Sequence, residues 1–436
     1  MADTQNTEAG KTGWPVIRET ITNRNILIYV LSLGASKTGF WGKKIAVGWL
    51  TWELTKDPAW LGIVAFAEIA PALFLVPFGG VVADRIGLLR TLRLTLVLQV
   101  LITLVLFSLV SLGVIDVNLL LLLVFSSSCV AALGWSSEYA LIGVLASDRH
   151  LVAGVVLQNL MKNVSRLGGP LLAGLMIAFS GVGGSILVAV GGYAIFFLGL
   201  SLISNAAPLP AAQSGAMRKP FSQIGEVFKF IFRNRAVMLL FGCLLLSFFG
   251  VSGVAGKKIL EQLMQASAGM QGPDMVFGLA GLVGMAIIVP IAIIIPIAMR
   301  GSIRNLTRYV GYGILSGAIA MMYLAFVPSN IALVVIGLVF FVSAETVIST
   351  GARVLALRTF PREMLGRGMA IYIVVGFFGP ALIVLLIGML ADFVPLSGVI
   401  GGAASLLICF WLWLRPRIPD MAAVLESPRL NDWNTA

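Results

Sequence analysis

Two identical short motifs place adjacent lysines inside long apolar stretches of the sequence. The motif GKKI occurs at positions 42–45, within FWGKKIAVGW, and again at positions 256–259, within VAGKKILEQL, 214 positions later. A lysine at the centre of a membrane-spanning helix costs about 2.5–3.5 kcal/mol on insertion scales, so such a residue is a candidate functional group. Because buried ammonium groups attract negative charge, the repeated pair predicts that an anion binds between two related parts of the chain.

Further charged residues share helix faces with these lysines. Lys37 and Lys44 are seven residues apart and therefore lie on one face of a helix, with Trp41 near that face between them. Lys162 and Arg166 are one helical turn apart in a second apolar stretch. We expect the following residues to form the substrate path: Lys37, Trp41, Lys43, Lys44, Lys162, Arg166, Lys257, Lys258 and Arg353. The acidic residues of the same stretches are candidates for carrying a coupled proton: Glu68, Glu138, Glu261 and Glu345.

Internal ion pairing is the structural alternative for these charges. Lys257 would then pair with Glu261 and Arg353 with Glu345, and the acidic residues of the second and fourth spans would pair with bases of the first and fifth. Four acids do not neutralise eight bases, however. The surplus positive charge predicts either a bound anion or lysines that have lost their protons.

The composition requires these stretches to cross a membrane as helices. Of 436 residues, 59% are hydrophobic and 11% are charged, whereas soluble domains have about a quarter charged residues. Long apolar runs without alternation exclude a β-barrel. The sequence has no motif of a nucleophile, phosphate-binding loop, metal cluster or cofactor site, so we expect neither an enzyme nor a metal or cofactor. Its basic residues are dispersed, which argues against nucleic-acid binding.

Runs bounded by glycine, proline, asparagine or charge predict twelve spans. They lie near 25–53, 58–83, 88–112, 117–146, 151–179, 183–205, 235–265, 274–299, 303–327, 330–357, 367–391 and 396–415. We therefore expect a tail at 1–24, a six-helix bundle at 25–205, a linker with a surface helix at 206–234, a second six-helix bundle at 235–415 and a tail at 416–436. One side of this arrangement has twenty-one of the lysines and arginines outside the spans, and the other side has Lys56 alone, so both termini are predicted to be cytoplasmic. The GKKI repeat, together with Gly154 and Gly368 at the same spacing, indicates two duplicated halves.

The stretch PFGGVVADRIGLLRTL resembles the signature of the major facilitator superfamily in the loop between its second and third spans. Gly80, Asp84, Arg85 and Gly87 match that signature, and Arg90 stands in for the basic residues that usually follow. The resemblance implies that these five residues form a latch in which Asp84 contacts the other half of the protein. From the residues themselves, we also expect the N-terminus of the following helix to stabilise the charge of Asp84.

The stretch SRLGGPLLAG in the fifth span resembles the signature of proton antiporters, although Ser165 and Ala173 replace two of its glycines. Gly169 and Pro170 are expected to bend this span, because proline lacks the amide hydrogen that a helix needs. The order of motifs over residues 23–415 resembles the transmembrane secretion effector subgroup, which includes enterobactin-type exporters. This resemblance implies an all-α membrane protein with twelve transmembrane helices in two pseudo-symmetric six-helix bundles.

We therefore expect a secondary transporter of an anionic small molecule that works by alternating access. The fifth-span signature and the subgroup resemblance favour antiport, that is, export coupled to proton entry. The alternatives are an anion exchanger, a cation-coupled importer of organic, phosphorylated or sulfonated anions, and a receptor or assembly protein of the same fold that transports nothing. The expected partners are the solute, protons or a counter-anion, and membrane lipids. The expected form is a monomer in the cell inner membrane.

Overall fold

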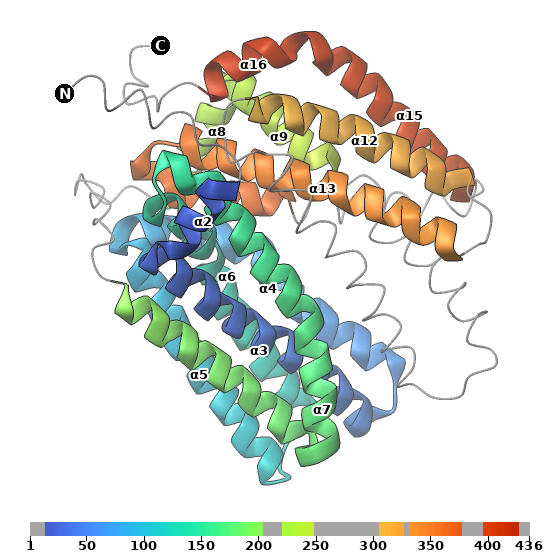
Figure 1. Ribbon diagram of the computed structural model, residues 1–436. Helices are drawn as coiled ribbons and strands as arrows, with labels where there is room; N and C mark the ends of the chain where they lie inside the picture. Colours follow the sequence, from blue (N-terminus) through green and yellow to red (C-terminus); the bar gives the residue numbers. More distant parts are fainter. Residues whose placement is uncertain (1–13, 204–219, 248–304, 327–330, 377–395, 427–436) are drawn as a thin grey trace.

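The computed structural model describes residues 14–203, 220–247, 305–326, 331–376 and 396–426, and these segments contain helices and no strand (Figure 1). A short helix, α2, covers Trp14–Thr22 and precedes the helices of the first bundle. Those are α3 (Arg24–Thr55), α4 (Pro58–Ile86), α5 (Leu88–Ser111), α6 (Val117–Leu145) and α7 (Asp148–Leu202). Within this bundle α3 packs along α7, and α4 packs along α6.

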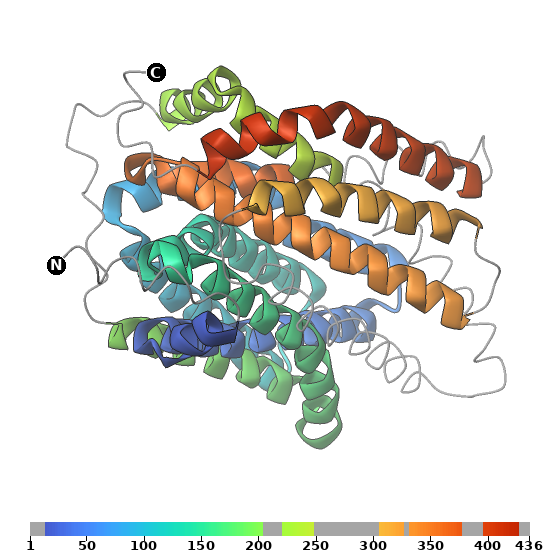
Figure 2. The ribbon, with the colours of Figure 1, turned by 45° about the horizontal axis from the view of Figure 1, so that its top comes forward.

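The remaining helices form a second group, which Figure 2 shows beside the first. They are α8 (Pro220–Arg233), α9 (Arg235–Ser247), α12 (Leu306–Phe326), α13 (Ile331–Thr359), Leu365–Gly376, α15 (Leu396–Leu414) and α16 (Ile418–Leu425). Helix α12 lies between α13 and α15, and α13 also contacts α6 and α7 of the first bundle. Helix α8 lies in the segment predicted as a linker with a surface helix, and α16 lies in the segment predicted as a tail.

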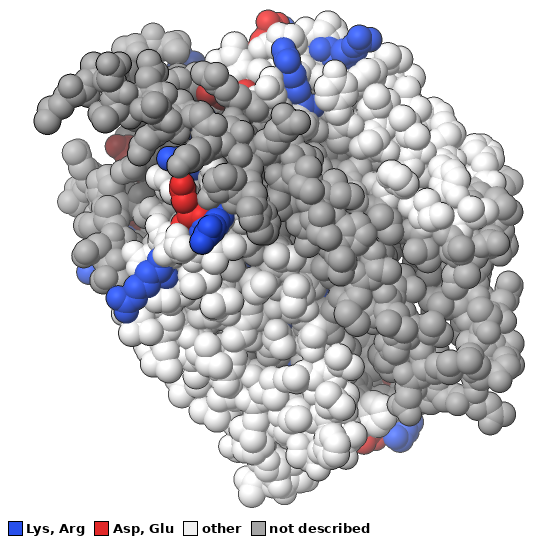
Figure 3. Space-filling model, viewed as in Figure 1, with Lys and Arg blue, Asp and Glu red and all other residues white. Residues whose placement is uncertain are grey.

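The outer surface of the described helices is suited to lipid. Five of them are long and apolar enough to cross a membrane: Ala59–Ile86, Leu88–Ser111, Val117–Leu145, Arg149–Leu202 and Leu306–Phe326. Large apolar side chains are exposed along these helices, for example Phe66, Phe74 and Phe179. On the face shown in Figure 3, charged side chains gather near the ends of the molecule and leave an uncharged area between them. Exposed apolar area on this scale requires a partner, and a bilayer supplies it.

Sequence signals at the helix ends explain where the helices of the first bundle begin. The side chain of Asn23 accepts hydrogen bonds from two backbone amides at the start of α3. Asp57 caps α4 ahead of Pro58, and Asp116 caps α6. Gly87 separates α4 from α5 with a φ of 95°, a conformation that a residue with a Cβ atom rarely adopts. This conformation accounts for the last glycine of the signature between the second and third spans.

The long helix α7 contains the predicted fifth and sixth spans. Its backbone leaves helical geometry at Gly181, where φ is 71°, and this residue lies in the predicted gap between the two spans. Pro170 lies inside the helix, and the bend expected there stays a prediction. Gly169 has a separate role, because a Cβ atom on it would lie 2.5 Å from the Trp41 Cβ and 2.8 Å from the Thr38 carbonyl oxygen. The glycine therefore lets α3 and α7 approach closely.

The described helices reproduce the internal repeat that the sequence indicated. Helix α6 covers residues 117–145 and α13 covers residues 331–359, so both have 29 residues and both ends differ by 214 positions. The second GKKI motif, at 256–259, lies outside the described residues. The equal length and the common offset of α6 and α13 support two halves related by duplication.

The contact between α3 and α7 gives a test of this packing. A Cβ atom on the buried Gly192 would lie 2.5 Å from the Ala35 carbonyl oxygen, whereas a Cβ atom on Gly191 would meet nothing within 4 Å. We expect Gly192→Leu to lower the stability of the purified protein by about 2 kcal/mol or more, because the helices must separate. Gly191→Leu is the matched control and is expected to leave stability unchanged or to raise it slightly. Thermal unfolding in detergent measures both, and equal melting temperatures for the two variants would contradict this packing.

Candidate functional site

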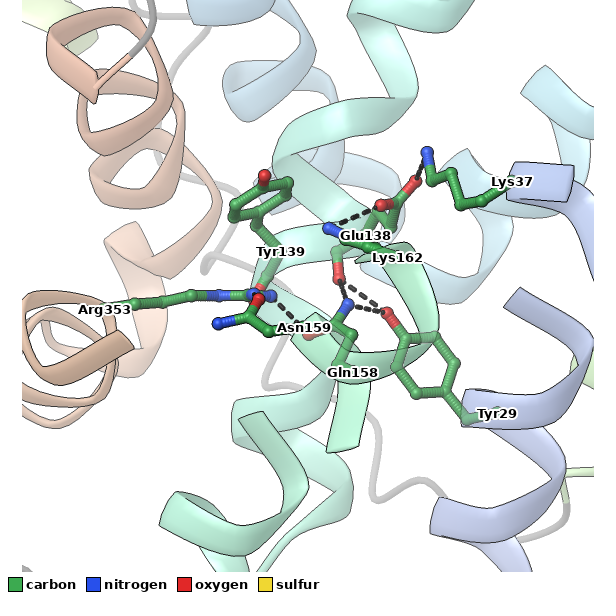
Figure 4. Close-up of polar contacts among 8 residues, drawn as sticks. All are labelled: Tyr29, Lys37, Glu138, Tyr139, Gln158, Asn159, Lys162 and Arg353. Atoms are coloured by element: carbon green, nitrogen blue, oxygen red, sulfur yellow. Dashed lines mark hydrogen bonds and ion pairs between the residues drawn. The ribbon is translucent and has the colours of Figure 1, made fainter. Parts of the chain in front are cut away.

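Two lysines from different helices hold one carboxylate inside the first bundle (Figure 4). The Lys37 Nζ atom of α3 lies 2.7 Å from the Glu138 Oε2 atom of α6. The Lys162 Nζ atom of α7 lies 2.9 Å from the other oxygen, Oε1. The Lys162 Nζ and Glu138 Oε1 atoms are buried, and neither makes a hydrogen bond of good geometry. Each lysine therefore interacts with its own oxygen of a single carboxylate, and the cluster has one positive charge in excess.

Neutral polar groups fix the backbone of this cluster. The Tyr29 hydroxyl donates a 2.6 Å hydrogen bond to the Glu138 carbonyl oxygen. The Gln158 Nε2 amide donates to the same carbonyl at 3.2 Å and to the Tyr29 hydroxyl oxygen at 2.8 Å. The Lys162 ammonium also lies 3.7 Å from the centre of the Tyr139 ring, a cation–π contact. Helices α3, α6 and α7 thus position the carboxylate through both its side chain and its backbone.

Arg353 reaches this region from α13 of the second group (Figure 4). Its guanidinium donates hydrogen bonds to the Asn159 Oδ1 atom at 3.2 Å, to the Tyr139 carbonyl oxygen at 3.2 Å and to the Gln158 Oε1 atom. The residue is 1% exposed, so the second group contributes a fully buried positive charge to the first. The predicted pair of Arg353 with Glu345 is wrong for the described residues. The side-chain amides of Gln158 and Asn159 on α7 lie within hydrogen-bonding distance of Arg353, whereas Glu345 lies two turns away on the same helix as Arg353.

The position of Arg353 follows from the internal repeat. Arg353 and Tyr139, which it contacts, are 214 positions apart and so occupy equivalent places in the two halves. In a two-fold arrangement a residue can contact its own equivalent only near the axis. The Arg353–Tyr139 contact therefore lies near the pseudo-symmetry axis between the halves, where major facilitator folds have their path.

A second ion pair lies on the same face of α3. The Lys44 Nζ atom is 2.9 Å from the Glu68 Oε2 atom of α4, a one-to-one pair without surplus charge. The Trp41 ring lies between two bases, 5.8 Å from the Lys44 ammonium and 5.3 Å from the Arg166 guanidinium. The structure thus brings Trp41 and Lys44 together, as their spacing indicated, and adds Arg166 from α7.

Lys43 points away from these residues, toward α5 and α6. Its ammonium donates a 2.8 Å hydrogen bond to the Ser127 hydroxyl, which in turn donates to the Gln99 Oε1 atom at 2.8 Å. Lys43 is buried and lies 5.4 Å from the centre of the Tyr193 ring. These neutral partners make Lys43 part of a polar network that joins three helices of the bundle.

The other candidate residues divide into two groups. Glu345 of α13 interacts electrostatically with Arg166 of α7. Lys257, Lys258 and Glu261 lie outside the described residues. Among the candidates in the described part, six bases, namely Lys37, Lys43, Lys44, Lys162, Arg166 and Arg353, occur with three acids, namely Glu68, Glu138 and Glu345. A surplus of positive charge remains, and its groups come from α3, α7 and α13.

The signature carboxylate Asp84 lies at the interface between the two halves. Its oxygens accept hydrogen bonds from the Gly366 amide at 2.7 Å, the Arg367 amide at 3.2 Å and the Arg367 Nε atom at 2.8 Å. The two amides belong to the first turn of helix Leu365–Gly376, whose N-terminus favours a negative charge. The expectation that the following helix α5 would supply this N-terminus is wrong, because the equivalent group comes from the other half.

The remaining signature residues surround this contact. A Cβ atom on Gly80 would lie 2.7 Å from the Gly366 carbonyl oxygen, so the first glycine permits the close approach of the halves. Arg85 and Arg90 are exposed. Arg367 is one of the twenty-one basic residues predicted to lie outside the spans, yet it is 8% exposed and also donates to the Glu226 Oε2 atom of α8 at 3.2 Å. Arg367 lies between two glycines, Gly366 and Gly368, and this feature of the sequence could have indicated that the arginine is tightly packed.

Within the described residues, no group of histidine, cysteine, aspartate and glutamate is arranged to hold a metal ion. The polar clusters are instead made of ammonium, guanidinium and amide groups that face carboxylates or carbonyl oxygens. Such groups bind anions and hold helices together.

Comparison with known proteins identifies the family. Residues 14–436 match the transmembrane secretion effector family. The chain belongs to this family of the major facilitator superfamily. The staphyloferrin A transporter of Staphylococcus aureus (strain NCTC 8325 / PS 47) is 26% identical over 141 residues, which are 32% of this chain and 36% of that protein. The match therefore spans about a third of the relative's length.

Solved structures confirm the predicted fold class. The human organic anion transporter MFSD10 (TETRAN) is 12% identical, with 90% of this chain and 99% of that chain covered and a TM-score of 0.64. A bacterial homologue of the iron transporter ferroportin in an outward-facing state is 16% identical, with 91% and 99% covered and a TM-score of 0.65. The major facilitator superfamily proton:xylose symporter XylE is 14% identical, with 91% and 96% covered and the same TM-score. The chain has the twelve-helix major facilitator fold in two pseudo-symmetric bundles.

The contact of Asp84 with the other half gives a second test. We expect Asp84→Asn to lower the population of the state seen here about tenfold, because a charge-assisted contact contributes about 1.5–3 kcal/mol. Glu226→Gln is the control, since it removes the more exposed acidic partner of Arg367 and is expected to have a much smaller effect. Spin labels at the exposed residues Arg90 and Glu363 report the separation of the halves. An unchanged distance distribution in Asp84→Asn would show that this contact does not hold the halves together.

Proposed function

We propose that this protein is a secondary transporter of an anionic small molecule. The observation that carries the proposal is the surplus of positive charge within the described helices, to which α3, α7 and α13 contribute and of which Lys43 and Arg353 are buried. Charges inside a membrane protein are costly and mark solute or ion pathways. Lys37 and Lys162 are the main candidates for contact with the solute, and Lys44, Arg166 and Trp41 are candidates for the adjoining part of the path.

The names of two similar proteins support the proposal of an anionic solute. One relative is named as a staphyloferrin A transporter, and one protein of the same fold is named as an organic anion transporter. The family name describes secretion, which favours export. Proton-coupled export remains our prediction, and anion exchange and cation-coupled uptake remain the alternatives.

The proposed mechanism is alternating access. The halves meet through Asp84 and through Arg353, so we assign the structure to a state that is closed at the end where Asp84 lies. The bias of basic residues supports our proposal that this end and both termini lie on the cytoplasmic side of the cell inner membrane. Opening at this end requires the hydrogen bonds of Asp84 to Gly366 and Arg367, and those of Arg353 to α6 and α7, to break.

Flux through reconstituted protein tests the proposal. We expect liposomes that contain the full chain to transport labelled citrate or staphyloferrin A faster than empty liposomes. Lys162→Gln is expected to lower this flux at least about tenfold, because it removes an ammonium that no other group replaces. Lys229→Gln is the matched control, since it makes the same charge change on the exposed face of α8.

Two results would contradict the proposal. The first is flux of uncharged sugars with no flux of any anion, which would make the lysines structural. The second is tight binding of an anion without flux in any direction or gradient, which is the result expected of a receptor with this fold.

A further inference from the structure

The Glu138 cluster has the geometry of a carboxylate-binding site that is occupied by a residue of the protein itself. Lys37 and Lys162 come from different helices and lie at 2.7 Å and 2.9 Å from the two oxygens of one carboxylate. A free carboxylate of a solute would be held between two ammonium groups in the same way. A purely structural ion pair needs only one lysine, as the pair of Lys44 with Glu68 shows.

We propose that a carboxylate group of the solute takes the place of the Glu138 carboxylate between Lys37 and Lys162, and that one proton binds to Glu138 as it is displaced. The proposal rests on the proposed transport of an anion. It goes further by naming the residues that contact the solute and the carboxylate that carries the proton. It also predicts how the two binding steps influence each other: the proton strengthens the binding of the anion and does not compete with it.

For a solute with two negative charges, the charge balance of Glu138 and its two lysines favours this proton, since the guanidinium of Arg353 is directed at amide and carbonyl oxygens of α6 and α7. With Glu138 ionised, the two lysines and one carboxylate have a net charge of plus one. A solute with two negative charges that arrived alone would make the site negative and leave Glu138 without its partners. A proton from water on Glu138 turns this carboxylate into a neutral acid, so that the two lysines and the dianion balance.

Among the residues that the structure describes, no neighbouring group can replace the lysines for a displaced Glu138. The side chain of Glu138 is 6% exposed, so water has little access to its charge. The polar and charged groups that face the cluster are Tyr29 and Lys37 of α3, Tyr139 of α6, Gln158 and Lys162 of α7, and Arg353 of α13. Of these, Tyr29 and Gln158 already donate to the Glu138 carbonyl oxygen, and the guanidinium of Arg353 is bound to α6 and α7. If Glu138 were displaced from the lysines while still ionised, its carboxylate would be a buried negative charge without a partner.

The buried ammonium of Lys162 is a second observation that points to a ligand. Its Nζ atom makes no hydrogen bond of good geometry, although an ammonium has three hydrogens to donate. The side chains of Lys37 and Lys162 are 19% and 17% exposed, more than that of Glu138. The exposed part of Lys162 is its carbon chain, since its Nζ atom is buried beside Glu138 and the Tyr139 ring.

The linkage between the proton and the anion is reciprocal. If protonation of Glu138 frees the lysines and strengthens anion binding, then the bound anion strengthens proton binding by the same factor. A proton antiporter requires the opposite, because in that case the proton must weaken the binding of the solute. The geometry of this cluster therefore points to movement of anion and proton in the same direction.

Titration of the purified full-length protein tests the proposal. The probes are ethane-1,2-disulfonate, whose own charge stays constant over the pH range used, and citrate, whose own titration is subtracted from the proton count. Above the pH at which Glu138 loses its proton, we expect the affinity for either probe to fall by about tenfold for each pH unit. About one proton is expected to be taken up for each probe molecule bound. Binding heats in two buffers of different ionisation enthalpy give the proton count.

Glu138→Gln separates this role from a structural one. Glutamine keeps the size of the side chain but is always neutral, so this variant is expected to bind the probes at high pH as tightly as the wild type does at low pH, without proton uptake. Glu53→Gln is the matched control, because it makes the same change at an exposed carboxylate of α3 and leaves both lysines on Glu138. Its proton uptake is expected to persist.

Three outcomes overturn the proposal. Probe binding without proton uptake in the wild type, or with proton release, contradicts the co-binding while leaving anion transport intact. Weaker probe binding at every pH in a folded Glu138→Gln protein makes Glu138 a structural residue. Failure of either probe to bind at any pH, in the wild type and both variants, contradicts the proposed function itself. If Glu138→Gln does not fold, the pH dependence of probe binding to the wild type still tests whether proton and anion bind together.

Discussion

The interaction on which the first bundle depends is the carboxylate of Glu138 between two ammonium groups. Three helices each contribute one charge to it, so the ion pairs fix α3, α6 and α7 relative to one another at the depth of the cluster. Glycines hold the same helices together above and below, since Gly39 and Gly192 bring α3 and α7 into backbone contact. The two lysines are therefore held in place by close packing, and only the carboxylate between them is exchangeable.

The two halves are joined by contacts of different kinds. At one end the charged Asp84 accepts three hydrogen bonds from Gly366 and Arg367. Near the pseudo-symmetry axis, Arg353 binds amide and carbonyl oxygens, which have no formal charge. A hydrogen bond between a guanidinium and a neutral acceptor is weaker than one between a guanidinium and a carboxylate. In the proposed alternating-access cycle the interface opens and closes, and neutral partners suit an arginine that is buried only while the halves meet.

Much of this architecture follows from the sequence, because its signals are local. Apolar runs predict the spans, and capping residues such as Asn23, Asp57 and Asp116 mark where helices begin. The spacing of Lys37 and Lys44 places both on one face of α3, and the structure gives each a carboxylate partner. The sequence also shows that bases outnumber acids. These conclusions need only helix geometry and charge counting.

The tertiary partners were harder to predict, because they depend on how helices distant in the sequence are packed. Arg353 was paired with Glu345 of its own helix, yet its partners are Gln158 and Asn159 of α7. Arg367 was counted among the basic residues outside the spans, yet it is the partner of Asp84. Lys43 is next to Lys44 in the sequence but about 100° away around the helix, so it faces Ser127 instead of the cluster. Adjacent residues of a helix thus belong to different sites.

A shared path for the proton and the anion is compatible with the secretion that the family name describes. A dianion that leaves with one proton carries one net negative charge out of the cell. An inside-negative potential favours this step by about 2.3 kcal/mol for each 100 mV. Only the pH difference opposes the exit of the proton, so the membrane potential can drive export without proton antiport. In this proposal the excess of lysines over carboxylates in the cluster binds the dianion, and the membrane potential drives its exit.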